Sequence, residues 1–145
     1  TMIYVSGIPA EYIDDVWDEC AQYVQMGNNK SQDEMDVSDI YFFLKEKEMQ
    51  LWVIFDKDNG KEIKAVITTQ ILNYPQKKVC RIVTLGGKEM DTWVAETLEI
   101  LESWSQEQQC DAMETVCRKG FIKKLKDFGY EQTYTILGKE LTTIH

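Results

Sequence analysis

The sequence is poor in the residues on which small metal-binding and disulfide-bonded proteins depend. It has one histidine, His145, and its four cysteines form no C-x-x-C pair. A structural zinc site normally draws on ligands paired at short spacing, so no metal site is expected. Because no internal histidine is present, Ser-His-Asp and Cys-His catalysis are excluded unless the C-terminal end folds back onto the site.

Long apolar runs and low-complexity stretches are also lacking. No apolar run approaches the ~20 residues that span a bilayer, and no signal peptide is evident because acidic residues follow Pro9 at once. Two prolines, 43% hydrophobic residues and 28% charged residues are typical of a globular chain. We therefore expect one soluble, cytoplasmic domain over residues 1–145, with reduced thiols.

Positive charge is scarce. The chain has 25 acidic and 16 basic residues, a net charge of −9. Such a surface repels phosphate backbones and anionic lipids, so neither a nucleic acid nor a membrane is expected as a partner. The exception is a basic cluster that fits a phosphate group, an acidic partner or simply a solvated helix face. It comprises Arg118, Lys119, Lys123, Lys124 and Lys126.

Hydrophobic periodicity predicts two helices in the first third of the chain. Residues 9–26 carry an apolar stripe at three- and four-residue steps, with acidic residues in the N-terminal half, as the helix dipole prefers. A shorter helix is expected over 37–47, with Ser38 as its N-cap. The aromatic residues of this second segment would also suit a strand.

The middle of the chain reads as an antiparallel meander. Strands are predicted over 49–55, 61–72 and 78–85, and Asn59-Gly60 supplies a tight turn between the first two. Gly86-Gly87 is expected to break the third strand. Asp91 is then expected to cap a long helix over 92–108.

The last third is expected to complete a mixed sheet. A strand over 110–116 directly follows the long helix, which predicts a parallel pair with the strand at 78–85. A helix over 118–128 and two alternating strands, 130–137 and 139–144, follow. The fold class is therefore α/β, a mixed central sheet with an antiparallel meander, one parallel pair and helices on both faces.

This order of elements resembles the GNAT superfamily, the GCN5-related N-acetyltransferases, over most of the chain. The most specific stretches are Arg-Lys-Gly-Phe-Ile-Lys-Lys-Leu-Lys-Asp-Phe-Gly-Tyr, ending at Tyr130, and Leu-Gly-Lys-Glu-Leu, ending at Leu141. The first is also similar to small GNAT-like proteins encoded by bacteriophages. The resemblance implies acetyl transfer from acetyl-CoA to a small-molecule or protein amine, in a host cytoplasm or a virion if the chain is phage-encoded.

The resemblance also implies where acetyl-CoA would bind. In the family the cofactor lies between the strands corresponding to 78–85 and 110–116, and its pyrophosphate sits at the start of the next helix. Unpaired N–H groups at a helix N-terminus favour the same place. The family's phosphate-loop glycines are absent here, and Gly86-Gly87 fits a plain strand-ending turn as well as a phosphate loop. The implied cofactor-binding residues are Ile82, Val83, Thr84, Gly86, Gly87, Lys88, Asp91, Thr92, Arg118 and Lys119.

The catalytic residues of the family have no clear counterparts in this sequence. Its proton-donating tyrosine corresponds to Leu125, and its glutamate base is not found. Thr84 and Cys117 remain as weak catalytic candidates, since threonine is a poor base and cysteine is often only a small apolar residue. Trp93 is placed to fill part of the cofactor slot.

Two functions therefore stay open from the sequence. One is an acetyl-CoA-dependent N-acyltransferase, in which a backbone N–H of residues 82–84 polarises the carbonyl. The other is a GNAT-like protein that has lost catalysis and acts through contacts with a protein partner, as a phage structural or host-interaction component. The fold alone does not decide between them, and the oligomeric state is not predicted.

Overall fold

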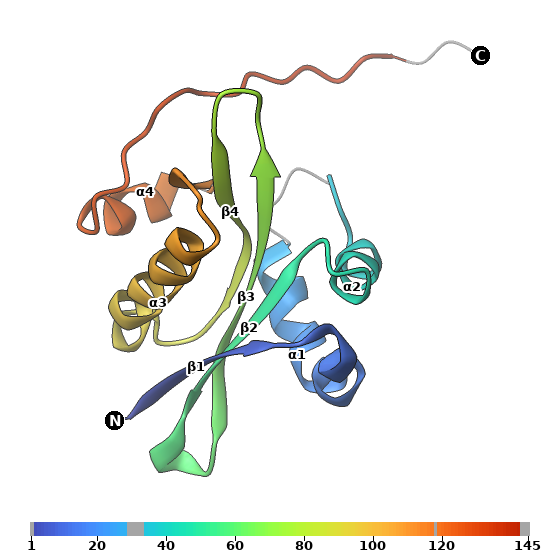
Figure 1. Cartoon of the computed structure of the whole chain (residues 1–145), viewed down its shortest axis with the longest axis vertical. Helices are drawn as coiled ribbons and strands as arrows, with labels where there is room; N and C mark the ends of the chain where they lie inside the picture. The colour runs from blue at the N-terminus through green and yellow to red at the C-terminus, as the bar shows by residue number, and fades with distance from the viewer. Residues whose placement is uncertain (1, 29–33, 118, 143–145) are drawn as a thin grey trace.

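The computed structural model describes residues 2–28, 34–117 and 119–142 (Figure 1). Its centre is one five-stranded sheet in the order β1-β2-β3-β4-β5. The strands are Ile3–Ile8 (β1), Gln50–Asp56 (β2), Glu62–Asn73 (β3), Lys78–Gly87 (β4) and Ala112–Thr115 (β5). Neighbours from β1 to β4 are antiparallel, and β4 and β5 are parallel. The predicted α/β class, with its meander and parallel pair, is confirmed.

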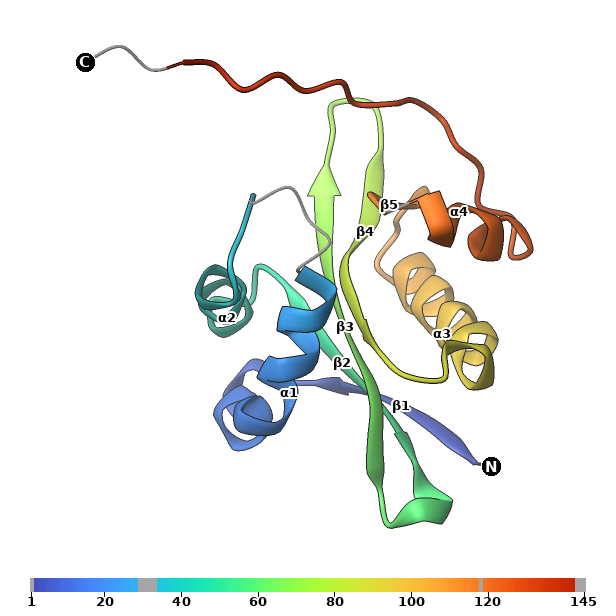
Figure 2. The same ribbon diagram turned by 180° about the vertical axis from the view of Figure 1, so that it is seen from behind.

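Helices cover both faces of the sheet (Figures 1 and 2). One face carries α1 (Ile13–Asn28) and α2 (Val37–Lys45), and the other carries α3 (Val94–Glu107) and α4 (Lys119–Lys126). Single 3-10 turns lie at Ala10–Tyr12, Lys57–Asn59 and Met90–Thr92.

Each face of the sheet has its own apolar core. Successive strand residues point to opposite faces, so Val66 packs toward α1 and α2 while its neighbour Ile67 packs toward α3. The α3 side contains the largest fully buried side chain, Trp93. The α1 and α2 side is filled by aliphatic residues such as Ile13 and Ile40.

The predicted caps of two helices are wrong. The N-cap of α2 is Asp36 and not Ser38, because Asp36 and Asp39 exchange two hydrogen bonds, each carboxylate accepting from the backbone N–H of the other residue at 2.9 and 3.0 Å. This reciprocal arrangement satisfies two helix-start donors, one more than a lone serine can. Asp91 caps nothing either, because it lies within a 3-10 turn and α3 begins only after Trp93.

The first strand, β1, was not predicted. It pairs antiparallel with β2 along the edge of the sheet. Its half-buried residues Ile3 and Val5 contact the core on the α3 side, and Ile8 contacts the core on the other side. A strand of this length carries too few alternating positions to be distinguished by periodicity alone.

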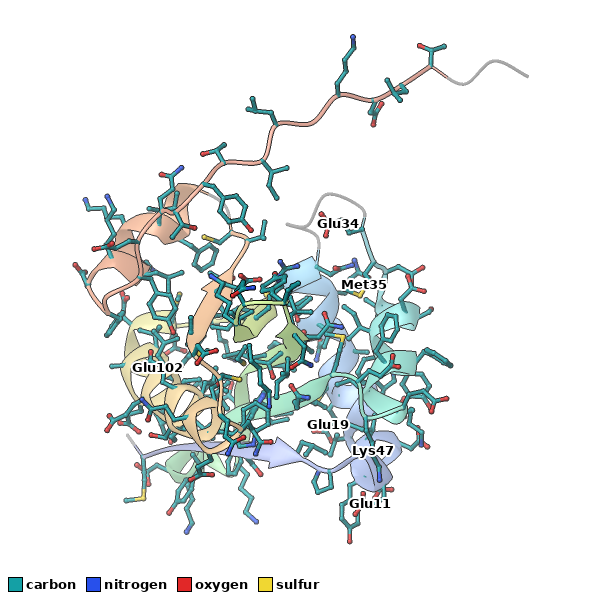
Figure 3. All side chains as sticks on the ribbon, turned by 45° about the horizontal axis from the view of Figure 1, so that its top comes forward. Glu11, Glu19, Glu34, Met35, Lys47 and Glu102 are labelled. Carbon is teal, nitrogen blue, oxygen red and sulfur yellow. The ribbon has the colours of Figure 1, made fainter. Side chains whose placement is uncertain are left out.

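The two strands predicted over 130–137 and 139–144 do not form. Residues 127–142 contain no helix or strand, and 143–145 lie outside the described residues. The chain instead leaves α4, passes the turn between β3 and β4 and runs away from the sheet (Figures 1 and 2). Side chains along this stretch project away from the rest of the molecule (Figure 3). Alternation gives strand propensity, but a strand also needs an edge to pair with.

Gly86 and Gly87 are the last two residues of β4, so the strand ends after them and not before them as predicted. Both residues continue the ladder with β3. The helix α1 crosses β4 here, and a Cβ on Gly86 would collide with the carbonyl oxygen of Tyr23 and come within 2.8 Å of the backbone nitrogen of Gly27. The absence of a side chain at Gly86 therefore allows the helix backbone to contact the strand backbone.

This contact generates a first prediction. Replacing Gly86 by alanine should lower the free energy of unfolding by about 3 kcal/mol, because the added methyl group overlaps backbone atoms that cannot move aside. Urea denaturation followed by circular dichroism measures the change. The matched control is Gly120→Ala in α4, where an added Cβ meets nothing within 4 Å, and this change should be neutral or slightly stabilising. Equal stability of the two variants would contradict the assigned contact.

Candidate functional site

The parallel strands β4 and β5 stay together for only part of β4. They pair from Val79 opposite Ala112 to Ile82 opposite Thr115. Beyond that point β4 continues to Gly87, whereas β5 has ended. We call the unpaired edge of β4 over residues 83–87, together with the end of β5, the split.

A β-bulge explains where the split begins. The register between β3 and β4 shifts so that Val83 is an extra residue on β4, directly after the last residue that pairs with β5. A bulge bends its strand and increases the local twist, which turns β4 away from β5. At the same point the Thr115 hydroxyl donates a hydrogen bond of 3.0 Å to the carbonyl oxygen of Ile82. This bond joins the last two residues that pair between β4 and β5.

The split presents backbone groups rather than reactive side chains. An edge without a strand partner leaves N–H and C=O groups available for pairing. An extended ligand that contains amide groups can pair with such an edge as another strand would. The free edge of β4 is therefore chemically suited to pairing with an extended, amide-bearing molecule.

The loop after β4 is held firmly on β3. The backbone N–H of Lys88 donates to the carbonyl oxygen of Lys64 at 3.0 Å, and its ammonium group pairs with Glu62. The nearly buried Lys64 ammonium group pairs with Glu89 at 3.1 Å. These contacts fix the path of the chain from the split to the start of α3.

The N-terminus of α3 combines features that attract and repel an anion. Its first backbone N–H groups have no partner within the helix and carry partial positive charge. Asp91, three residues before α3, has a side chain that is 90% exposed, and the Lys124 ammonium group of α4 lies 3.7 Å from its carboxylate. The Thr92 hydroxyl donates to the carbonyl oxygen of Glu89 at 2.7 Å, so it is already engaged.

Trp93 packs into the core beneath α3. Its indole is fully buried, and its Nε1 donates a hydrogen bond of 2.9 Å to the carbonyl oxygen of Lys88. This hydrogen bond anchors the loop at Lys88 to the buried indole ring.

The structure brings only some of the predicted binding residues to the split. Ile82 and Val83 lie where it begins, and Gly86 and Gly87 lie at its far end, Gly86 against α1 and Gly87 against Lys64 and Ala65 of β3. Lys88, Asp91 and Thr92 belong to the chain between β4 and α3. Lys119 is the first residue of α4, and Arg118 lies outside the described residues. Sequence reasoning missed the bulge at Val83 and the hydroxyl of Thr115, because neither leaves a local pattern.

Thr84 has a structural partner. It lies directly opposite Thr68 of β3, both side chains are buried, and their hydroxyl oxygens are 2.6 Å apart. One of the two hydroxyls donates to the other. The pair satisfies two polar groups inside the sheet.

Neither Cys117 nor Leu125, the other two positions considered for catalysis, provides an activated catalytic group. Cys117 is exposed two residues beyond β5, and partial loss of the water around its sulfur raises the pKa of the thiol above the ordinary value. The nucleophilic form of cysteine is the thiolate, so this shift opposes activation. Leu125 is buried in the core on the α3 side.

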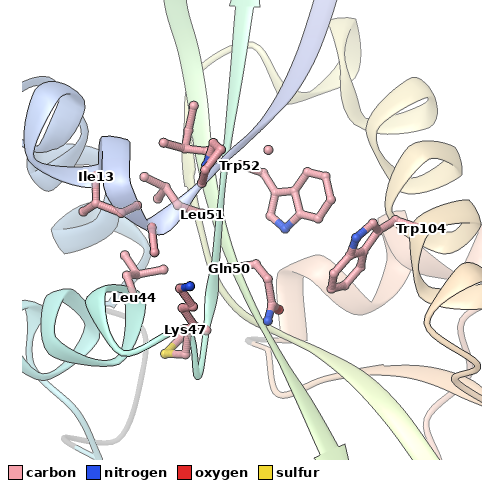
Figure 4. A pocket seen from close by; sticks show the side chains of 12 residues that line it. Ile13, Leu44, Lys47, Gln50, Leu51, Trp52 and Trp104 are labelled. Atoms are coloured by element: carbon pink, nitrogen blue, oxygen red, sulfur yellow. The ribbon is translucent and has the colours of Figure 1, made fainter.

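A cavity lies apart from the split, at the end of β1 (Figure 4). It measures about 310 Å³ and includes Lys47, Gln50, Trp52 and Trp104 in its lining. The Trp52 indole is held in place by a hydrogen bond of 2.9 Å from its Nε1 to the Thr69 hydroxyl. The volume suits a small ligand, but none of the lining residues belongs to β4 or β5.

Neither a metal-binding cluster nor a membrane-spanning helix is present in the part of the chain that the structure describes. No three histidine, cysteine or acidic side chains within it come together in a way that could hold a metal ion. No helix within it is long and apolar enough to cross a bilayer.

Solved structures reveal the fold to which this arrangement belongs. The sequence matches no protein-family model and no curated protein. A probable acetyltransferase superimposes with a TM-score of 0.70 at 12% identity, over 98% of this chain and 99% of that one. A predicted acetyltransferase from Clostridium acetobutylicum, solved with acetyl-CoA, gives 0.68 at 12% over 96% of both chains. A GNAT family acetyltransferase from Staphylococcus aureus gives 0.64 at 12% over 97% and 100%. The chain therefore has the GNAT fold.

The threonine pair generates a second prediction. Thr84→Val should lower the free energy of unfolding by about 2 kcal/mol, because the buried Thr68 hydroxyl loses its partner. The double change Thr68→Val with Thr84→Val should recover most of that loss, since no unpaired hydroxyl remains. Chemical denaturation of the single and double variants measures the coupling. Additive losses would contradict a direct hydrogen bond between the two residues.

The raised pKa of Cys117 generates a third prediction. At neutral pH its alkylation by iodoacetamide should be several-fold slower than that of a peptide with the same neighbouring residues, and its rate should still be rising above pH ~8.5, where a free thiol is half ionised. Mass spectrometry of the modified chain follows the reaction. Faster alkylation than in the peptide would mark an activated thiol and contradict this assignment.

Proposed function

We propose that this chain is an N-acyltransferase that binds acetyl-CoA along the β4–β5 split and transfers the acetyl group to an amine. The observation that carries the proposal is the split, where a bulge at Val83 frees the edge of β4 next to a helix N-terminus. A protein of the same fold has been solved with acetyl-CoA, which supports acetyl-CoA as the ligand.

The residues at the split fit the shape and the chemistry of acetyl-CoA. The amide groups of its pantetheine arm would pair with the free backbone of residues 83–87, as a strand does. Its phosphates would lie toward the N-terminus of α3, where unpaired N–H groups favour anions. The Lys124 ammonium group lies 3.7 Å from the exposed Asp91 carboxylate at that end. When bound, acetyl-CoA supplies an activated acyl group as a thioester.

The chain would contribute mainly position and polarisation to the reaction. Thr84 is hydrogen-bonded to Thr68, and the raised pKa of the Cys117 thiol opposes its activation as a nucleophile. A backbone N–H of residues 82–84 directed at the acyl oxygen would stabilise developing negative charge. Holding the amine close to the acyl carbon would supply much of the remaining acceleration. The amine would have to arrive in its neutral form.

A second function, partner binding without catalysis, is favoured by the acidic side chains around the α3 N-terminus. Asp91 and Glu96 lie just before and within the first turn of α3, where a pyrophosphate would meet like charge. If these groups prevent acetyl-CoA from binding, the GNAT fold serves here as a scaffold for protein contacts.

A fourth prediction separates the two functions. Acetyl-CoA and CoA should each raise the melting temperature in a saturable manner, because a ligand at about 100 times its dissociation constant stabilises the native state by about 2.7 kcal/mol. Asp91→Asn should tighten binding by about threefold, since removing one charge near the phosphates is worth about 0.7 kcal/mol in water. Thermal-shift titration and calorimetry measure both effects.

The matched control for this prediction is Glu46→Gln, which removes an exposed charge at the far end of α2 and should leave the affinity unchanged. Absence of any shift at saturating acetyl-CoA in both the parent chain and Asp91→Asn would overturn the acyltransferase proposal and favour partner binding.

A further inference from the structure

The cavity at the end of β1 lacks the negative charge that the chain as a whole carries. The chain has 25 acidic residues and a net charge of −9. Among the described residues, those that line this cavity include no aspartate or glutamate, and their one charged side chain is that of Lys47. An anionic group can therefore enter the cavity without meeting a carboxylate in its wall.

The size and the wall of the cavity suit one aromatic ring. Its volume of about 310 Å³ is twice the ~150 Å³ of a cavity that holds one benzene molecule. Apolar side chains that include Ile13, Leu44 and Met49 form one part of the wall. The indoles of Trp52 and Trp104 form another and stand edge to face, with their ring centroids 5.2 Å apart. The space fits a ring with a short side arm.

A chain of hydrogen bonds orients the side-chain amide of Gln50. The Trp52 indole can only donate, so the Thr69 hydroxyl accepts from it at 2.9 Å and gives its own hydrogen to Gln50 Oε1 at 2.9 Å. The amide oxygen is therefore engaged, while Gln50 Nε2 has no acceptor among the described residues. Because Gln50 lines the cavity, this N–H₂ group is available to a ligand there.

Two further donors in the wall are also available. Within the part of the chain that the structure describes, Lys47 forms no ion pair and Trp104 Nε1 donates no hydrogen bond. Lys47 lies between Leu44 and Gln50, and Trp104 lies on the far side of Gln50 (Figure 4). The cavity thus offers N–H donors from three side chains and no competing acidic acceptor.

The charges outside the cavity set the direction in which a ligand would lie. A second hollow, of about 530 Å³, shares Trp52 and Trp104 with the cavity. It is lined by the acidic side chains of Glu96, Glu99 and Glu107. Like charges repel, so the negative end of a ligand would turn away from this hollow and toward Lys47 and Gln50.

We propose that this cavity binds a small aromatic carboxylate, with the ring against Trp52 and Trp104 and the carboxylate at Lys47 and Gln50. An ionised carboxylate only accepts hydrogen bonds, which matches a wall that offers donors. Hydrogen bonds to an ionised group are also stronger than those between neutral groups. The site is separate from the split and does not depend on acetyl transfer.

The fifth prediction tests the sign of the ligand's charge with three probes of the same shape. Phenylpropanoate should bind the full chain with one-to-one stoichiometry in calorimetry at neutral pH. Its methyl ester should bind about fivefold more weakly and phenylpropylamine about 25-fold more weakly, because one unit charge near 4 Å in water is worth a factor of about five. An amine that binds as tightly as the acid, or an acid that does not bind, would overturn the proposal.

Two variants test the donors without disturbing the fold. Gln50→Glu keeps an oxygen for the Thr69 hydroxyl but replaces the N–H₂ group by a second oxygen, so phenylpropanoate should bind about tenfold more weakly and the amine more tightly. Lys47→Gly should weaken phenylpropanoate about fivefold. It should nevertheless leave the melting temperature equal or higher, because Lys47 has a φ of 64°, which favours glycine.

The matched control is Lys61→Gly. Lys61 has the same φ of 64° and lies in the turn at the other end of β2, so this change should leave the affinity unaltered. Equal affinities of the parent chain, Lys47→Gly and Gln50→Glu would contradict the assigned site.

The indole N–H signals locate the bound probe in proton–nitrogen correlation spectra. The signal of Trp104 should move on titration with phenylpropanoate, because its N–H lies in the cavity wall without a partner among the described residues. The signal of Trp93 should stay, because its Nε1 is hydrogen-bonded to Lys88 near the split. Movement of Trp93 with Trp104 unchanged would place the probe at the split and overturn the proposal.

Discussion

The close contact between the backbones of α1 and β4 is the constraint on which the rest of the structure depends. Gly86 brings the strand against Tyr23 and Gly27 of the helix without an intervening side chain. This contact fixes the far end of β4 on one face of the sheet, while Trp93 supports the following loop from the other face. The position of the α3 N-terminus follows from both. A local turn signal in the sequence thus proves to be a packing requirement between distant elements.

The two sides of the split are held with unequal firmness. β4 is paired with β3 along its whole length and covered by α1. β5 is short, ends at Thr115 and, within the residues that the structure describes, pairs with β4 alone. Rearrangement on binding any ligand is therefore expected on the side of β5 and α4, because that side has fewer contacts to break. The Lys124–Asp91 ion pair links α4 to the turn before α3. Because both side chains are exposed, this ion pair contributes little free energy against the separation of α4 from that turn.

The elements that the sequence predicts correctly are those whose residues carry the signal locally. The apolar stripe of α1 and the alternating strands of the meander are visible because burial repeats at the period of the element. The bulge at Val83 arises from pairing with β3, and the start of α3 is set by the packing of Trp93. Neither is a property of a short stretch of chain. The predicted C-terminal strands fail for the same reason, since strand propensity in residues 133–137 becomes a strand only beside an edge.

A site built from backbone also explains how the fold can persist while the sequence drifts. The split needs an extra residue in β4, a free strand edge and a helix N-terminus, and many side chains satisfy these demands. Acetyltransferase structures of this fold share only 12% of their residues with this chain. The positions that tolerate few substitutions are those in close contact, such as Gly86 and the Thr68–Thr84 pair. Charge near the N-terminus of α3, by contrast, changes with a single residue such as Asp91. The fold therefore fixes the position of the split, whereas a few exposed charges set the electrostatic potential at its end.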